Sequence, residues 1–221
     1  MEGMDTITAP APWALMGRGY IIAVKMAPDF VNEKGFVPKT LEGCFKGGLG
    51  TIMYVDYHYS DVGPYQELLF IPGKFDFGAG KYFSITKIFV STRDSVQNGQ
   101  TNWGIPKEIA TFETTRQSKN TEHIRVMKDG TVCTDLTLRS LPIRIPVTTA
   151  LVPAFLRTLA QHHLGKTYLT TLKARGTIKP ACLKDSRING AFFPDFTRGR
   201  VISAFEVPGF FMVFPRARIP L

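Results

Sequence analysis

Short apolar runs rich in β-branched and aromatic residues dominate the chain, and turn-forming residues separate them. Runs of this kind are typical of β-strands. The run at residues 51–59 is rich in Tyr, Ile and Val, and the run at 67–71 ends at the turn dipeptide Pro72-Gly73. Strands are therefore predicted at residues 18–24, 51–59, 67–71, 82–90, 124–128, 131–138, 201–205 and 210–214.

The clearest local signal is the Asp129-Gly130 pair between two strand-like runs. A two-residue hairpin turn of this kind needs positive φ at both central positions, which Asp-Gly accommodates. Helical signals are few. One short helix is predicted at residues 93–98, capped by Ser91-Thr92 and ended by Gly99, and another at 153–163, where apolar residues recur at helical spacing.

Together these elements predict an α+β protein that is mainly antiparallel β with few helices. We expect a single domain over residues 1–221, in which residues 1–16 form an N-terminal extension. No linker or repeat interrupts the chain, and the many short strands favour a closed or strongly curved sheet.

Composition removes several other classes of protein. Hydrophobic residues make up 44% of the 221 positions and charged residues 20%, which excludes a wholly disordered chain. No apolar stretch approaches the roughly 20 residues of a membrane-spanning helix, and residues 1–5 do not resemble a signal peptide. The three cysteines are widely spaced, so a reducing, cytoplasmic location is expected.

Positive charge is concentrated in the C-terminal part of the chain. Residues 139–221 hold 13 Lys and Arg against three Asp and Glu, whereas residues 1–138 hold 14 basic and 15 acidic residues. Such an excess is compatible with an anionic ligand or with nucleic acid. The basic residues are dispersed and no aromatic stacking motif accompanies them, so a solvated basic surface or a subunit contact is favoured, and no nucleic-acid partner is expected.

The sequence holds no pattern typical of a metal or nucleotide site. His162 and His163 are adjacent, so on a helix they would diverge by about 100°. Zinc-protease, nucleophile-elbow, phosphate-loop and dinucleotide motifs are all missing from the sequence. We therefore expect neither a metal nor a cofactor.

Lys107 is the most informative candidate. Pro106 fixes its own φ and holds Ile105 in an extended conformation, so Lys107 begins a strand at a defined place. Its surroundings are apolar, with Trp103 and Ile109 nearby. Such a lysine either extends its amine to solvent or is buried with a lowered pKa, and local sequence alone favours the first alternative.

Two segments carry a resemblance to a known family. The stretch Gly-Pro-Tyr-Gln-Glu67-Leu and the stretch Trp-Gly-Ile-Pro-Lys107-Glu-Ile-Ala resemble, in order and spacing, those of the acetoacetate decarboxylase superfamily. The resemblance runs from about Gly17 to the C-terminus. It implies a conical, largely antiparallel β-barrel around a buried lysine, and a homo-oligomer.

The resemblance also implies roles for three residues. Lys107 corresponds to the lysine that forms a Schiff base, Glu67 to an active-site glutamate, and Arg18, in a short Arg-Gly-Tyr match, to the arginine that binds the substrate carboxylate. Two positions depart from the family pattern. Glu108 stands where the decarboxylases have a second lysine, and Ile52 stands where they have a further glutamate.

The chemistry of an imine sets the demands on Lys107. An amine attacks a ketone only when it is neutral, and a free lysine has a pKa of about 10.4. Burial can lower this pKa by up to about 3–5 units. Neighbouring side chains of a strand point to opposite faces, so the carboxylate of Glu108 need not face the amine of Lys107.

The resulting expectation is a cofactor-independent lyase that forms a Schiff base between Lys107 and a keto acid and decarboxylates a β-keto acid. One alternative is an imine-dependent aldolase or dehydratase acting on a larger keto compound, for which Glu67 would be the acid or base. Another is a barrel that binds a hydrophobic ligand without catalysis. In each case the partner is a small molecule, and no membrane is expected.

Overall fold

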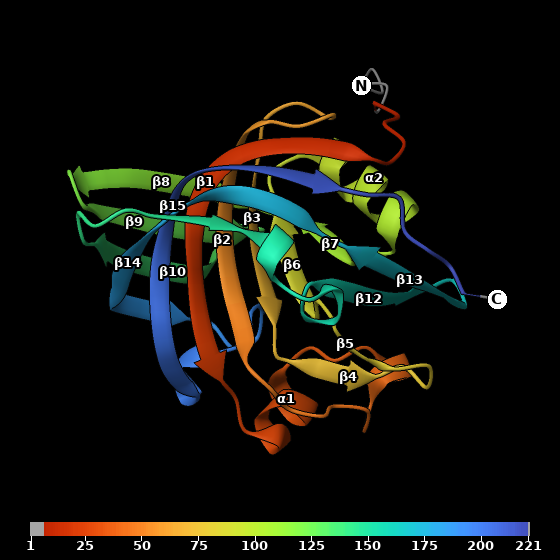
Figure 1. Cartoon of the computed structure of the whole chain (residues 1–221). Helices are drawn as coiled ribbons and strands as arrows, with labels where there is room; N and C mark the ends of the chain where they lie inside the picture. Colours follow the sequence, from red (N-terminus) through yellow and green to blue (C-terminus); the bar gives the residue numbers. More distant parts are fainter. Residues whose placement is uncertain (1–6, 221) are drawn as a thin grey trace.

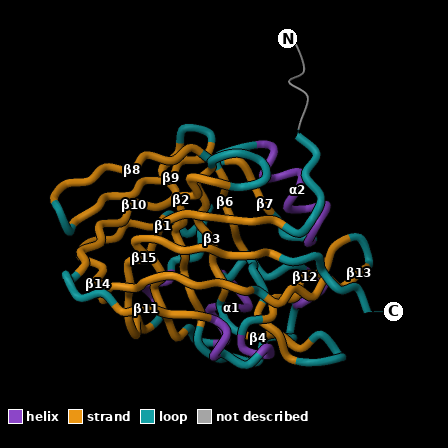
Figure 2. The backbone as a smooth tube through the Cα atoms, turned by 45° about the horizontal axis from the view of Figure 1, so that its top comes forward, coloured by secondary structure: helices purple, strands orange, loops and turns teal. Residues whose placement is uncertain are grey.

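The computed structural model describes residues 7–220, and strands make up most of this range (Figure 2). The strands form a large sheet of eleven strands and a smaller one of four. They are β1 Trp13–Lys25, β2 Gly50–Tyr59, β3 Tyr65–Ile71, β4 Lys74–Asp76, β5 Lys81–Phe83, β6 Lys87–Val90, β7 Lys107–Ile109, β8 Thr111–Ser118, β9 Thr121–Lys128, β10 Thr131–Ser140, β11 Ile145–Thr148, β12 Thr158–His163, β13 Lys166–Thr171, β14 Lys173–Ile188 and β15 Arg200–Phe214.

Helices are short in this part of the chain. Between residues 7 and 220 two α-helices occur, α1 Pro28–Lys34 and α2 Arg93–Trp103. Four single-turn 3-10 helices complete the set, namely η1 Lys39–Leu41, η2 Thr149–Leu151, η3 Ala154–Leu156 and η4 Phe196–Arg198. No helix in the described range is long and apolar enough to cross a membrane.

The prediction of a mainly antiparallel β protein with few helices is confirmed, but the prediction of a closed or strongly curved, conical barrel is wrong. The large sheet runs in the order β7-β6-β3-β2-β1-β15-β14-β10-β9-β8 (Figure 1), with β11 also paired to β14 (Figure 2). Its ends, β7 and β8, do not pair with each other in residues 7–220. They are separated along the chain only by Ala110, so one continues into the other and they cannot form a ladder.

Both faces of the central strands are buried. Tyr54 and Leu68 belong to one hydrophobic core, and Tyr57 and Leu69, which have the opposite parity on β2 and β3, belong to a second core. Because side chains alternate between faces along a strand, one set of strands serves both cores. The second core is the one that borders the site described below.

Several local predictions are confirmed. Asp129 and Gly130 both have positive φ, 50° and 77°, in the turn between β9 and β10. Thr92 caps α2 by accepting a hydrogen bond from the backbone N–H of Ser95. The helix continues past Gly99 to Trp103, so the predicted end at residue 98 is one turn too early.

The predicted helix at residues 153–163 is wrong. Residues 154–156 form the single turn η3, and residues 158–163 form β12, which pairs with β13. Leu164 and Gly165, both with positive φ, make a tight hairpin turn between them. Cross-strand pairing of the hairpin outweighed the helical spacing of apolar residues.

The N-terminal segment is fastened to α2. The side chain of Asn98 accepts a hydrogen bond from the N–H of Ala9, and Asn102 donates one to the carbonyl of Ala9. β1 begins at Trp13, within the range 1–16 expected to precede the domain. Residues 1–6 of that range lie outside the described residues.

Candidate active site

Three neighbouring strands bring Lys107 and Glu67 to one face of the large sheet. β6 pairs with β3 on one side, where Ile88 lies opposite Leu69, and with β7 on the other side, where Ile88 lies opposite Lys107. Paired residues share a face, and Glu67 is two positions before Leu69. The side chains of Glu67 and Lys107 therefore project into the same space.

The amine of Lys107 lies at the centre of a small polar cluster. Its Nζ is 3.0 Å from Oε2 of Glu67 and donates hydrogen bonds to Oγ of Ser95 at 2.9 Å and to Oη of Tyr65 at 3.4 Å. Lys107 and Glu67 each expose only 5% of their surface. The expectation from local sequence that this amine extends to solvent is therefore wrong.

Two tyrosines complete the surroundings of Glu67. Its Oε1 accepts a hydrogen bond from Oη of Tyr57 at 3.5 Å, and the rings of Tyr57 and Tyr65 pack with their centroids 4.6 Å apart. Tyr65 also lies under the amine of Lys107, 4.9 Å from Nζ to the ring centroid. The carboxylate is thus fixed between an amine and a phenol.

The charge state of the cluster differs from the expectation. Burial acts to lower the pKa of Lys107, but the Glu67 carboxylate and the Tyr65 hydroxyl oppose it, and the net pKa is raised. The expected lowering by an apolar pocket is therefore wrong for the protein without substrate. Burial raises the pKa of Tyr65 to about 12 and that of Tyr57 well above its usual value, so both phenols are neutral near pH 7.

Gly99 makes room for the lysine side chain. A Cβ atom at this position would lie 2.6 Å from Cδ and 2.9 Å from Cε of Lys107. Contacts this short do not occur between unbonded carbon atoms, so a larger residue would displace the lysine. α2 therefore supplies both Ser95, which binds the amine, and a gap through which the side chain reaches it.

The cluster lies in a largely apolar cavity of about 550 Å³. Its walls come mainly from β1, β2, β3, β14 and β15 and from residues 147–157, which cross in front of β2 and β3 (Figure 1). Among the described residues, the charged side chains that line it are Glu67, Lys107, Arg157 and Arg175. The polar chemistry is thus confined to a few positions in an apolar space.

The structure does not bring Arg18 to this cavity. Its guanidinium donates to both carboxylate oxygens of Glu122 at 2.8 Å and is 3.0 Å from Oδ2 of Asp56. Arg18 lies opposite Asp56 in the β1–β2 ladder, and Asp56 lies opposite Gln66, so all three have the parity of the face away from Glu67. The predicted carboxylate-binding role of Arg18 therefore has no geometric support at this site.

Glu108 faces away from the amine of Lys107, as strand alternation predicts. Its carboxylate binds the amines of Lys87 and Lys128 on the other side of the sheet. These two cations lower the pKa of Glu108, although partial burial acts in the opposite direction. The residue that replaces the second lysine of the family pattern is thus paired elsewhere.

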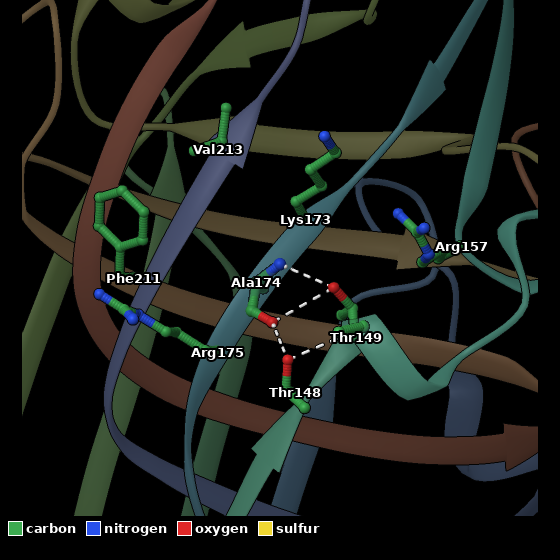
Figure 3. Close-up of a pocket in the computed structure, with 9 residues that line it drawn as sticks. Thr148, Thr149, Arg157, Lys173, Ala174, Arg175, Phe211 and Val213 are labelled. Carbon is green, nitrogen blue, oxygen red and sulfur yellow. Dashed lines mark hydrogen bonds between the residues drawn. The ribbon is translucent and has the colours of Figure 1, made fainter.

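A second hollow, of about 560 Å³, borders β14 and β15 (Figure 3). Arg157, Lys173 and Arg175 line it beside the hydroxyls of Thr148 and Thr149, and no carboxylate lines it within the part of the chain that the structure describes. Part of the positive charge of the C-terminal region gathers here. Lys173 and Arg175 are exposed, so this hollow lacks the buried amine that imine chemistry needs.

The sequence alone gave Tyr57, Tyr65, Ser95 and Gly99 no role in the active site. A signal for Tyr65 was present, because it precedes Glu67 by two residues and so shares its face of the strand. Tyr57 reaches the site through the β2–β3 register, and Ser95 and Gly99 through the packing of α2 on β7. Such long-range placement leaves no local pattern.

A carboxylate, an amine and hydroxyls within contact of each other can exchange protons and can form an imine with a carbonyl compound. No group of three or more metal-ligating side chains gathers anywhere in residues 7–220. In this cavity the amine and the carboxylate that lie within such contact are those of Lys107 and Glu67.

Several solved structures share the fold of this chain. The chain is similar to acetoacetate decarboxylase from Legionella pneumophila (TM-score 0.68, 13% identity, 100% of this chain and 91% of that one). It is also similar to an acetoacetate decarboxylase-like enzyme from Sphingomonas wittichii RW1 (TM-score 0.69, 12% identity, 96% and 94%). A third is the enduracididine biosynthesis enzyme MppR complexed with pyruvate (TM-score 0.66, 14% identity, 96% and 91%).

Identities this low establish the fold alone, and the sequence itself supplies the assignment. No curated protein sequence matches the chain significantly. The sequence profile of the family described as acetoacetate decarboxylase matches residues 4–163, a range that contains both Glu67 and Lys107. The chain therefore belongs to the acetoacetate decarboxylase family, whose enzymes process keto acids.

Proposed function

We propose that this protein is a cofactor-independent lyase that forms a Schiff base between Lys107 and a keto acid. One observation carries the proposal: the buried amine of Lys107 lies 3.0 Å from the Glu67 carboxylate inside an apolar cavity. Family membership and the similar solved structures support keto-acid chemistry at such a site.

The Lys107–Glu67 pair supplies the proton transfers. Lys107 is an ammonium in the ligand-free protein because its pKa is raised. When a substrate displaces water from the cavity, the ammonium can pass a proton to Glu67 and become a nucleophile. Its lone pair then bonds to the carbonyl carbon, and protons returned by Glu67 and the ammonium leave with the carbonyl oxygen as water.

Decarboxylation follows from the electron demand of the iminium. The bond between the α-carbon and the carboxylate carbon breaks, its electron pair moves into the iminium, and the products are CO₂ and a neutral enamine. The reaction removes one positive and one negative charge, and a water-poor cavity favours charge loss. Protonation of the enamine carbon and hydrolysis of the imine release the ketone and regenerate Lys107.

A second reaction has its own support. The carboxylate of Glu67 is placed to remove a proton next to the iminium carbon, which leads to aldol-type addition or dehydration. Arg18 was expected to bind the substrate carboxylate, but it lies outside the cavity and binds Glu122 and Asp56 instead. The similar MppR structure holds a condensation product of pyruvate and an aldehyde. We therefore keep an imine-dependent aldolase or dehydratase as the alternative.

Borohydride trapping tests the imine directly. We expect incubation with a panel of keto acids and borohydride to fix one ligand on Lys107 as a secondary amine, located by peptide mapping. Lys107→Ala and Lys107→Arg should both abolish the adduct, since a guanidinium stays protonated. Lys87→Met is the matched control, because Lys87 is also buried but binds Glu108 outside the cavity.

The outcome also separates the alternatives. Release of CO₂ from a β-keto acid supports decarboxylation, and exchange of α-hydrogen for deuterium without CO₂ supports the aldolase-type reaction. Adducts on surface lysines only, or no adduct with any keto compound, would refute the imine mechanism and leave a protein that binds hydrophobic ligands without catalysis.

A further inference from the structure

The cavity is much larger than a small keto acid. Its volume is about 550 Å³, which falls in the range of sites for drug-sized ligands. If a methylene-sized group takes about the 30 Å³ of a liquid water molecule, this space holds on the order of fifteen such groups or more. A four-carbon substrate such as acetoacetate would leave most of it unfilled.

The cavity walls away from Lys107 carry apolar side chains that remain partly exposed to solvent. Met53, Val55, Phe210 and Met212 line the cavity and are only half-buried, although they lie on the inner face of the sheet. Leaving such surface in contact with water is unfavourable by about 25 cal/mol per Å². These residues present no group that could bind a hydroxyl or a charge, so they match an apolar part of a ligand.

The rim of the cavity is also rich in apolar side chains, although Thr148, Thr149 and Arg175 line the cavity as well. Leu49, Val147, Val152 and Leu156 line the cavity and are exposed to solvent. Arg157 fastens the rim, because its guanidinium donates to the carbonyls of Val152 and Leu172. An apolar path therefore leads from the Lys107 amine to the surface.

We infer that the substrate is a keto acid with an extended apolar body, bound with its carbonyl at Lys107 and its tail directed to the rim formed by Leu49, Val147, Val152 and Leu156. That the substrate carries a keto group rests on the proposed imine chemistry. The apolar body follows from the cavity alone.

Chain length provides the measurement. Each methylene that enters the cavity should tighten binding about fourfold, which is about 0.8 kcal/mol at 1.4 kcal/mol per tenfold change. We propose to measure dissociation constants of methyl ketones of increasing chain length for the Lys107→Ala variant by calorimetry. A steady gain over several methylenes, ending where the chain passes the rim, is expected. Equal affinity for the shortest and longest ketones would overturn the inference.

A pair of rim substitutions locates the tail. Leu156→Asp introduces a charge at a rim residue that is 44% exposed, and Leu164→Asp introduces one at a residue that is 84% exposed outside the cavity. Both side chains are accessible, so the fold should tolerate either change. Leu156→Asp should weaken long ketones about tenfold and leave short ones unchanged, whereas Leu164→Asp should affect neither. Equal effects of the two variants would contradict the proposed path.

The experiment is independent of the proposed reaction, because Lys107→Ala cannot form an imine. A steep length dependence together with failed borohydride trapping would refute the proposed function and keep the ligand class. Successful trapping together with a flat length dependence would support the proposed function and refute the ligand class.

Discussion

Replacing Glu67 by Gln should move the reactivity of Lys107 and the turnover of the enzyme in opposite directions. The substitution keeps the size of the side chain but removes its charge. Burial lowers the pKa of Lys107, and the Glu67 carboxylate is the largest of the groups that raise it. Without that carboxylate, burial is opposed only by neutral hydroxyls such as those of Tyr65 and Ser95.

The size of the change follows from the burial of the amine. Fully buried lysines have a pKa lowered by up to about 3–5 units, and the remaining hydrogen bonds reduce this effect. Each unit by which the pKa falls raises the neutral fraction of the amine at pH 7 about tenfold, and burial of this amine allows a fall of about two units. The neutral fraction in Glu67→Gln should therefore rise about a hundredfold.

Turnover should nevertheless fall by about 10²-fold or more, because the variant has lost the group that carries the protons. Competitive acetylation between pH 6 and 11, read by mass spectrometry with the exposed lysines as internal references, measures the neutral amine. Glu67→Asp, which keeps the charge, is the control and should retain a raised midpoint. A Lys107 midpoint in Glu67→Gln that stays in place or moves upward would refute the electrostatic reasoning.

Three further predictions test the surroundings of the pair. Gly99→Ala should favour the helix by about 0.5–1 kcal/mol yet lower turnover about 10²-fold by displacing Lys107; unchanged turnover with an unchanged melting temperature would contradict the contact. Arg18→Gln should lower the free energy of unfolding in urea by about 1–3 kcal/mol, because Glu122 loses its partner. The same variant should leave KM for the keto acid unaltered. A raised KM with unchanged stability would instead support the carboxylate-binding role of Arg18. Tyr65 has a pKa of about 12 in the folded protein and about 10 when unfolded, so its contribution is complete below pH 10 and is lost as the pH rises toward 12. Urea unfolding should show a loss of up to about 3 kcal/mol over this interval that is smaller in Tyr65→Phe.

Some strands of this protein could be predicted because their signals are local, whereas others, among them β8 and the longest strand β14, were not predicted. The apolar runs and the Asp129-Gly130 turn specify the β9–β10 hairpin without reference to the rest of the chain. The β12–β13 hairpin was missed because residues 153–163 also fit a helix, and only the pairing with residues 166–171 decides between the two. The open ends of the large sheet likewise depend on which strands pair.

In the candidate site, too, local sequence was not enough and long-range pairing decided the outcome. Lys107 and Glu67 came from the family resemblance, since local sequence alone favoured an exposed lysine. Arg18 was predicted to reach the cavity, but it aligns with Asp56 and Gln66 on the other face of the sheet. Its neighbours Gly17 and Gly19 are the residues of this segment that lie on the cavity face. A shift of one residue in strand register exchanges the two faces of a sheet, and a single sequence does not specify register between distant strands.

The coupling of Lys107 to Glu67 links the two proposals. In the ligand-free protein the carboxylate holds the amine in its charged, unreactive form. An apolar substrate that fills the cavity removes water from around the pair, and removal of water disfavours the two charges relative to the neutral amine and acid. A short substrate leaves water beside Lys107 and Glu67, so both stay charged. A long substrate displaces that water and favours the neutral pair. Substrate length should therefore act on kcat as well as on KM, because the apolar body that provides binding also produces the neutral amine that the reaction consumes.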